Sequence, residues 1–117
     1  MKVRSIAAHD QVDVTMEDAA GVRMRMLIGF DDGAQNFHMR HFEVAPAGHT
    51  PHHQHDYEHE VLILKGRGTA RSERDDRPVK PGDVVFIPAN EVHQFVNDSG
   101  EVLEFICSIP APKDRSS

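Results

Sequence analysis

Turn-forming residues divide this chain into short segments, and that division restricts its fold more than any other feature. Clusters of Gly, Pro, Asn and Asp recur at intervals of about ten residues, as in all-β sandwiches and barrels. No segment has the periodicity of a helix longer than about two turns. We therefore expect an all-β fold, a small barrel or sandwich of antiparallel strands. The expected strands are 22–27, 37–44, 60–66, 68–74, 84–88, 92–97 and 102–109.

Particular residues set the turns between these strands. The segment 45–51 contains two prolines and a glycine, so we expect it to end the strand that precedes it. In the stretch 80–83, Gly82 stands where a tight turn needs a positive φ. Further turns are expected at 75–76 and 97–101.

The length and composition indicate one domain. The chain has 117 residues, and no linker or internal repeat divides it. We expect a single domain over 1–117, with its core over about 20–110, a short N-terminal arm and a frayed C-terminal tail. The apolar content is 38%, without a run that could span a membrane or serve as a signal peptide. The cytoplasm is therefore the expected location.

The charge and the cysteine content limit the kinds of partner and the redox compartment that we expect for this chain. The net charge is −6, and the 13 Lys and Arg residues are scattered, so there is no basic face for nucleic acid. Cys107 is the single cysteine, which rules out an intramolecular disulfide and fits a reducing compartment.

Histidines concentrate in one stretch of the chain. Five of the nine lie within 48–66. His53 and His55 share a face of an extended segment, with Cβ atoms roughly 6–7 Å apart. His59 or Glu60 follows after a short turn, and His93 lies on another expected strand. These side chains can meet at one metal ion, and imidazole suits Zn(II), Cu(II), Fe(II), Ni(II) and, at lower affinity, Mn(II). The remaining histidines are expected at the surface, namely His9, His38, His41, His49 and His52.

The first half of this constellation resembles the cupin superfamily. The usual motif is a glycine, five residues, His-x-His, three or four residues, a glutamate and a later glycine. Here it reads Gly48, His53, His55, Glu60 and Gly66.

A second motif strengthens the resemblance. It reads Pro81-Gly82-Asp83, Pro88, His93 and Asn97. Asn90 stands where a glycine is usual, and asparagine also tolerates a left-handed turn.

Over about residues 10–111 the chain looks like the small single-domain cupins that bind manganese through four histidines. The resemblance implies a small antiparallel β-barrel of the jelly-roll (double-stranded β-helix) type. It also implies His53, His55, His59 and His93 as ligands, with Mn(II) as the first metal and Fe(II) as the second. Spacing alone leaves the third ligand open between His59 and Glu60, and the resemblance favours His59.

Alternation on the strands predicts the walls of the pocket. The inward-facing apolar side chains would either lie above the metal or simply fill the barrel core. Arg40, Glu58 and Glu60 are the charged groups that could act on a substrate, and Arg40 is either a surface residue or a partner for a substrate carboxylate. The predicted pocket residues are Phe42, Phe95, Phe105, Cys107 and Ile109.

The resemblance implies a mononuclear oxygenase-type enzyme for a small, partly apolar organic molecule. One alternative is redox-neutral isomerase or lyase chemistry by metal polarisation. The other is a binding module without turnover. We also expect a homodimer in which residues 12–16 cross to the partner.

Overall fold

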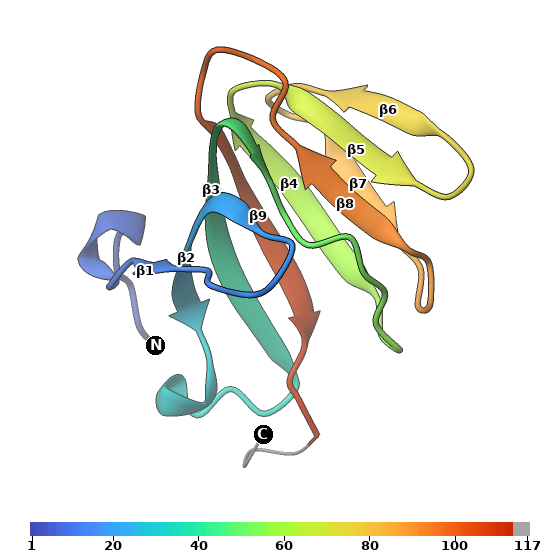
Figure 1. Ribbon diagram of the computed structural model, residues 1–117. Coiled ribbons are helices and arrows are strands. Elements are labelled where there is room, and N and C mark those ends of the chain that lie inside the picture. The colour runs from blue at the N-terminus through green and yellow to red at the C-terminus, as the bar shows by residue number, and fades with distance from the viewer. Residues whose placement is uncertain (114–117) are drawn as a thin grey trace.

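The computed structural model describes residues 1–113, whose regular structure is almost all strand (Figure 1). Two short 3-10 turns, η1 (Ile6–Ala8) and η2 (Phe30–Asp32), are the helical segments of this part of the chain. The all-β prediction is confirmed. Residues 114–117, the end of the tail that we expected to be frayed, lie outside the described residues. The strands are β1 (Val12–Asp13), β2 (Ala20–Ile28), β3 (Phe37–His49), β4 (His59–Lys65), β5 (Gly68–Ser72), β6 (Asp76–Val79), β7 (Val84–Ile87), β8 (His93–Val96) and β9 (Leu103–Pro110).

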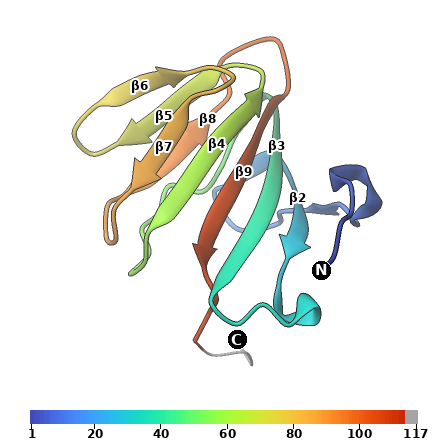
Figure 2. The ribbon, with the colours of Figure 1, turned by 180° about the vertical axis from the view of Figure 1, so that it is seen from behind.

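The strands form one antiparallel sheet that curls on itself. The order is β6-β5-β8-β3-β9-β4-β7, and β2 also pairs with β3 and carries β1 at its outer side. Seen from either side, the β6-β5-β8 end of the sheet lies against the β4-β7 end (Figures 1 and 2). The antiparallel barrel of the prediction is thus present. No helix of residues 1–113 is long and apolar enough to cross a membrane.

Alternating side chains fill the inside of the curl. On β9 every second residue is buried, and these residues meet others from β3, β4 and β8. This period of two is what a strand with one face toward a core requires. The buried apolar cluster contains Val22, Val44, Val61, Ile63, Val79, Ile87, Phe95, Leu103, Phe105, Cys107 and Ile109.

The strand β3 is longer than predicted. We expected it to end at residue 44, but it continues through Pro46 to His49. The strand bulges at Ala47, whose φ is +65°. The backbone N–H of Ala47 donates to the carbonyl oxygen of Asn97, and the N–H of Asn97 donates to the carbonyl oxygen of Gly48, both at 2.9 Å. Gly48 lies so close to β2 that a Cβ there would stand 2.5 Å from the carbonyl oxygen of Ala20. The prediction was wrong because the proline occupies a position where no ladder donor is needed.

The strand β6 was not predicted, because Pro78 stands inside it. Within residues 1–113, β6 pairs only with β5, so Pro78 lies on an edge strand, where a missing donor is tolerated. Two other turn predictions hold. Gly82 has a φ of +91° and Asn90 a φ of +68°, so both adopt the left-handed conformation that their positions predict.

Two histidines predicted at the surface are buried. His38 is 3% exposed, and its Nε2–H donates to the carbonyl oxygen of Ala34 at 3.0 Å. His41 is fully buried with Nε2 2.7 Å from Glu104 Oε1. Arg25 of β2 lies beside His41, with Nη1 3.5 Å from Nδ1, and its Nε donates to the carbonyl oxygen of His9 in the N-terminal arm.

The N-terminal arm includes the residues that were predicted to cross to the partner of a homodimer. Its strand β1 pairs with β2 of the same chain, through Val12 with Met24 and Asp13 with Arg23. Crossing of residues 12–16 to a partner stays a prediction.

Candidate metal centre and substrate cavity

Four imidazoles lie together inside the barrel. His53 and His55 come from the segment before β4, His59 begins β4, and His93 begins β8. The ring centroid of His55 lies 4.3 Å from that of His53, 5.1 Å from His59 and 6.1 Å from His93. The His93 centroid lies 4.8 Å from His59 and 5.5 Å from His53. The four predicted ligands therefore form one cluster.

Backbone hydrogen bonds hold this cluster in register. His53 and His93 exchange N–H···O bonds of 3.2 and 3.0 Å, which join two segments 40 residues apart. The N–H of Asn90 donates to the carbonyl oxygen of His55 at 2.6 Å. The Nδ1–H of His93 donates to the carbonyl oxygen of Glu91 at 3.0 Å, which leaves its Nε2 lone pair free.

Three of the four imidazoles, those of His53, His55 and His59, have lowered pKa values and are neutral near pH 7. Burial, followed by the neighbouring imidazoles, lowers the pKa of His53 to about 4. Burial and His93 lower the pKa of His59 to about 3. The pKa of His55 is lowered for the same reasons. Neutral imidazoles keep the lone pairs that a metal ion needs.

The donor atoms suit a divalent cation, although the rings are not closed around one point. Nε2 of His53 lies 3.2 Å from Nε2 of His55, and Nδ1 of His59 is buried without a hydrogen-bond partner. Within residues 1–113 no group of three or more His, Cys, Asp or Glu side chains is already arranged as a metal site. The imidazoles therefore fit a metal by chemistry and proximity, and they would turn to bind it.

Low imidazole pKa values make the stability of the metal-free protein depend on pH. Below about pH 6.5 the unfolded chain protonates His53 and His59, whereas the folded chain does so only near 4 and 3. The unfolded state then binds more protons, so the free energy of unfolding should fall between pH 6.5 and 5. Urea midpoints across this range measure the effect. His59→Gln should flatten the profile, whereas His52→Gln, at an exposed position, should not; a flat wild-type profile would contradict this.

A cavity of about 160 Å³ adjoins the imidazoles. Its aromatic wall is continuous, because Phe105 stacks on Phe42 at 5.3 Å between centroids and lies 4.7 Å from Phe95. Phe42, Phe95, Phe105 and Cys107 line it, but Ile109 is buried in the core away from it. The other lining residues are Met16, Val22, Arg40, Thr50, Pro51, His53, His55, Tyr57, His59, Val61, Ile87 and His93.

The three charged residues that were predicted to act on a substrate differ in their position relative to this cavity. Arg40 lines it, with Nη2 3.4 Å from the sulfur of Cys107 and Cζ 5.1 Å from the ring centroid of Phe42. Glu58 and Glu60 are exposed and do not line it. Within residues 1–113, no aspartate or glutamate contributes to its walls.

Tyr57 is a cavity residue that we did not predict. Its ring stacks on His55, with centroids 4.8 Å apart, and lies 5.1 Å from the centroid of His59. Burial raises the pKa of its phenol, so it stays protonated at neutral pH. Tyr57 has the same parity as His55 and His59, and extending the alternation across the turn would have found it.

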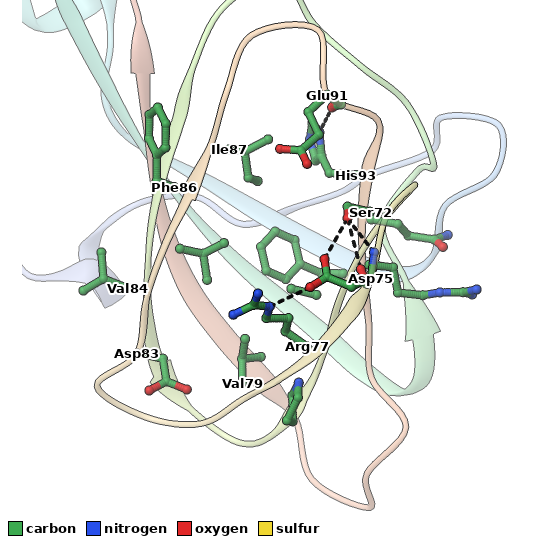
Figure 3. A pocket seen from close by; sticks show the side chains of 16 residues that line it. Ser72, Asp75, Arg77, Val79, Asp83, Val84, Phe86, Ile87, Glu91 and His93 are labelled. Atoms are coloured by element: carbon green, nitrogen blue, oxygen red, sulfur yellow. Dashed lines mark hydrogen bonds and ion pairs between the residues drawn. The ribbon is translucent and has the colours of Figure 1, made fainter.

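A second and larger cavity, of about 360 Å³, opens between β5-β6 and β7 (Figure 3). Two of its charged groups pair with each other, since Arg77 Nε donates to Asp75 at 2.9 Å, and Ser72 Oγ donates to the backbone carbonyl of Asp75 at 3.0 Å. It shares Ile87, His93 and Phe95 with the imidazole cavity. The two cavities are therefore separated by these shared side chains. All four imidazoles line the smaller cavity, whereas only His93 lines the larger one.

Comparison with known proteins identifies the family model that fits this chain. The model described as a cupin domain matches residues 40–109. That range contains the four imidazoles, Arg40 and the whole aromatic wall.

Similar proteins have several different activities. The chain is 43% identical to 1-methylthio-D-xylulose 5-phosphate methylsulfurylase of Rhodospirillum rubrum over 77 residues, 66% of this chain and 49% of that protein. It is 38% identical to an oxalate-binding protein of Thermotoga maritima over 58 residues, 49% of this chain and 48% of that protein. The chain thus matches about half the length of these curated relatives.

A solved structure matches more of the chain. The polyketide cyclase RemF from Streptomyces resistomycificus superposes with a TM-score of 0.90 and 33% identity, over 96% of this chain and 80% of that one.

Proposed function

This chain belongs to the cupin family, and on that premise we propose that it is a metal-dependent enzyme for a small, partly apolar organic substrate. One observation carries the proposal: four imidazoles gather beneath an aromatic-walled cavity. His53, His55, His59 and His93 would hold the ion, with Mn(II) and then Fe(II) as the first choices and Zn(II), Ni(II) or Cu(II) as further candidates.

The reaction that the cavity supports best is redox-neutral. A bound divalent ion would supply Lewis acidity to a substrate oxygen. The chain's own residues would bind the apolar part of the substrate against Phe42 and Phe105 and exclude water from it. The protonated phenol of Tyr57 can donate a hydrogen bond, or a proton, to an oxygen that gains negative charge.

Two further observations favour this class. The matched solved structure is a polyketide cyclase, and ring closure of a polyketide needs no oxidant. The cavity also presents the thioether of Met16, which oxidants attack.

Oxidative cleavage, the activity that the sequence resemblance implies, is the second candidate. No carboxylate of the described residues lines the cavity, so its walls there lack a dedicated general base of the kind used in many isomerases and lyases. Activation of dioxygen at a metal does not require such a base.

Metal exchange distinguishes the two. The protein is purified with its native metal, stripped, and reloaded with Mn(II), Fe(II) or Zn(II), and then given β-diketones, enols and catechols in air and under argon. Redox-neutral catalysis predicts product with Zn(II) and without oxygen, whereas an oxygenase consumes oxygen and fails with Zn(II). If no metal supports turnover of any compound, the enzyme proposal is wrong and a binding module remains.

A further inference from the structure

The cavity contains a positive charge that the protein does not neutralise. Within residues 1–113 two arginines are half-buried, Arg25 and Arg40. Arg25 donates to the carboxylate of Glu43 at 3.4 Å, whereas Arg40 has no acidic partner among the ion pairs of this part of the chain. Removing a cation from bulk water without a counter-charge is costly, so the position calls for an explanation.

The groups that do contact Arg40 cannot balance its charge. Its Nη2 meets the sulfur of Cys107, which is only a weak acceptor. Burial raises the pKa of this thiol, so it remains neutral. The Phe42 ring offers a cation–π contact, and Nε of Arg40 is buried without any hydrogen-bond partner.

The fold places this cation where a ligand would meet it. Arg40 lies on β3 opposite Cys107 of β9, with Phe42 two residues further along on the same side. Its charge contributes to lowering the pKa of His53, His55 and His59, so it acts directly on the imidazole cluster.

We infer that Arg40 is the anion-recognition residue of this cavity and that the ligand is a small organic monoanion, a carboxylate attached to an apolar or aromatic group. The inference rests on the proposed function in taking the same cavity as the substrate site. A guanidinium matches a carboxylate through two parallel N–H···O bonds, and Nε would be one of the two donors. The stacked Phe42 and Phe105 suit the apolar part.

The size and charge of the cavity select a carboxylate over a phosphate. A phosphate ester carries close to two negative charges, and Arg40 is the single arginine or lysine of residues 1–113 that lines the cavity. The volume of about 160 Å³ also restricts the ligand to a small molecule.

Paired charged and neutral probes test the inference. Acetate and benzoate are compared with acetamide and benzamide by calorimetric titration, using both the metal-free and the Zn(II)-loaded protein. Benzoate should bind at least about tenfold more tightly than benzamide, in line with a hydrogen bond to a charged group. Arg40→Gln should weaken benzoate binding by about tenfold or more while leaving benzamide within about twofold. Arg40→Lys should give an intermediate loss, because it keeps the charge without the fork.

The controls separate this role from a structural one. Arg71→Gln removes the same charge from an exposed ion pair with Asp76 and should leave benzoate binding unchanged. The thermal midpoint of metal-free Arg40→Gln should be at or above that of wild type, since an unpaired charge is removed. The inference is overturned if neither carboxylate binds saturably, if benzamide binds as well as benzoate, if Arg71→Gln weakens benzoate equally, or if Arg40→Gln unfolds at a clearly lower temperature. Use of metal-free protein keeps these outcomes independent of the metal proposal.

Discussion

Replacing His59 by Ala should lower the affinity of the proposed centre for a divalent metal at least about a hundredfold, whereas replacing Glu60 by Gln should leave it unchanged. Adjacent strand residues point to opposite faces, so these two side chains cannot both reach the cavity. His59 is 5% exposed and lies in the imidazole cluster, with a buried Nδ1 that lacks a partner. Glu60 is exposed on the opposite face of β4, where its neighbour across to β7 is the exposed Phe86.

Elemental analysis after gel filtration, followed by competition with a chelator, measures this effect. Far-UV circular dichroism of each variant establishes that the fold is retained. His52→Ala serves as a matched histidine control, because His52 is exposed and its parity differs from that of His53. Metal loss in Glu60→Gln with retention in His59→Ala would reverse the assignment of the third ligand.

Asn97→Ala should destabilise the protein by about 2–4 kcal/mol, because several hydrogen bonds of one buried amide are lost together. Asn97 is fully buried, and its amide donates to the carbonyl oxygens of Val44 at 2.8 Å and Glu101 at 2.6 Å. Its Oδ1 accepts from the backbone N–H of Ser99 at 3.0 Å and from the hydroxyl at 2.8 Å. Alanine would remove the amide donor of the Val44 carbonyl, leave the Glu101 carbonyl with only the Ser99 hydroxyl at 3.2 Å, and release the 97–101 turn.

Urea unfolding of wild type and variant gives the free-energy difference directly. Asn36→Ala, at an exposed position, is the matched control and should change the free energy of unfolding by less than about 0.5 kcal/mol. A loss below about 1 kcal/mol for Asn97→Ala would mean that water replaces the side chain. It would also mean that the motif asparagine does not hold this turn.

Local rules predicted most of the fold, and tertiary pairing accounts for the errors. Alternation and turn residues located β2, β4, β5, β7, β8 and β9, because each has one face toward the core. The continuation of β3 beyond Pro46 depends on donors and acceptors at 97, which lie far away in sequence. The Pro78 strand was missed because a sequence does not reveal which strand will be at an edge.

At the site, the alternation of residues along a strand predicted which side chains point inward, but not how far along the barrel each one lies. Phe105, Cys107 and Ile109 have the same parity, yet only the first two reach the cavity. The sequence left Arg40 undecided between surface and pocket, and its position became clear only once β9 placed Cys107 opposite it. His41 was misassigned because its buried position depends on tertiary neighbours, Arg25 of β2 and Glu104 of β9, that lie far from it in sequence.

The barrel closes without a hydrogen-bonded seam. Within residues 1–113, β6 and β7 end the strand order and do not pair, so side chains such as Val79, Val85 and Ile87 hold the two ends together. Amide protons on the free sides of β6 and β7 can therefore exchange with deuterium while the rest of the sheet stays intact. Because Ile87 also walls the imidazole cavity, fluctuations that open this seam would change the room beside the histidines without breaking a strand pair.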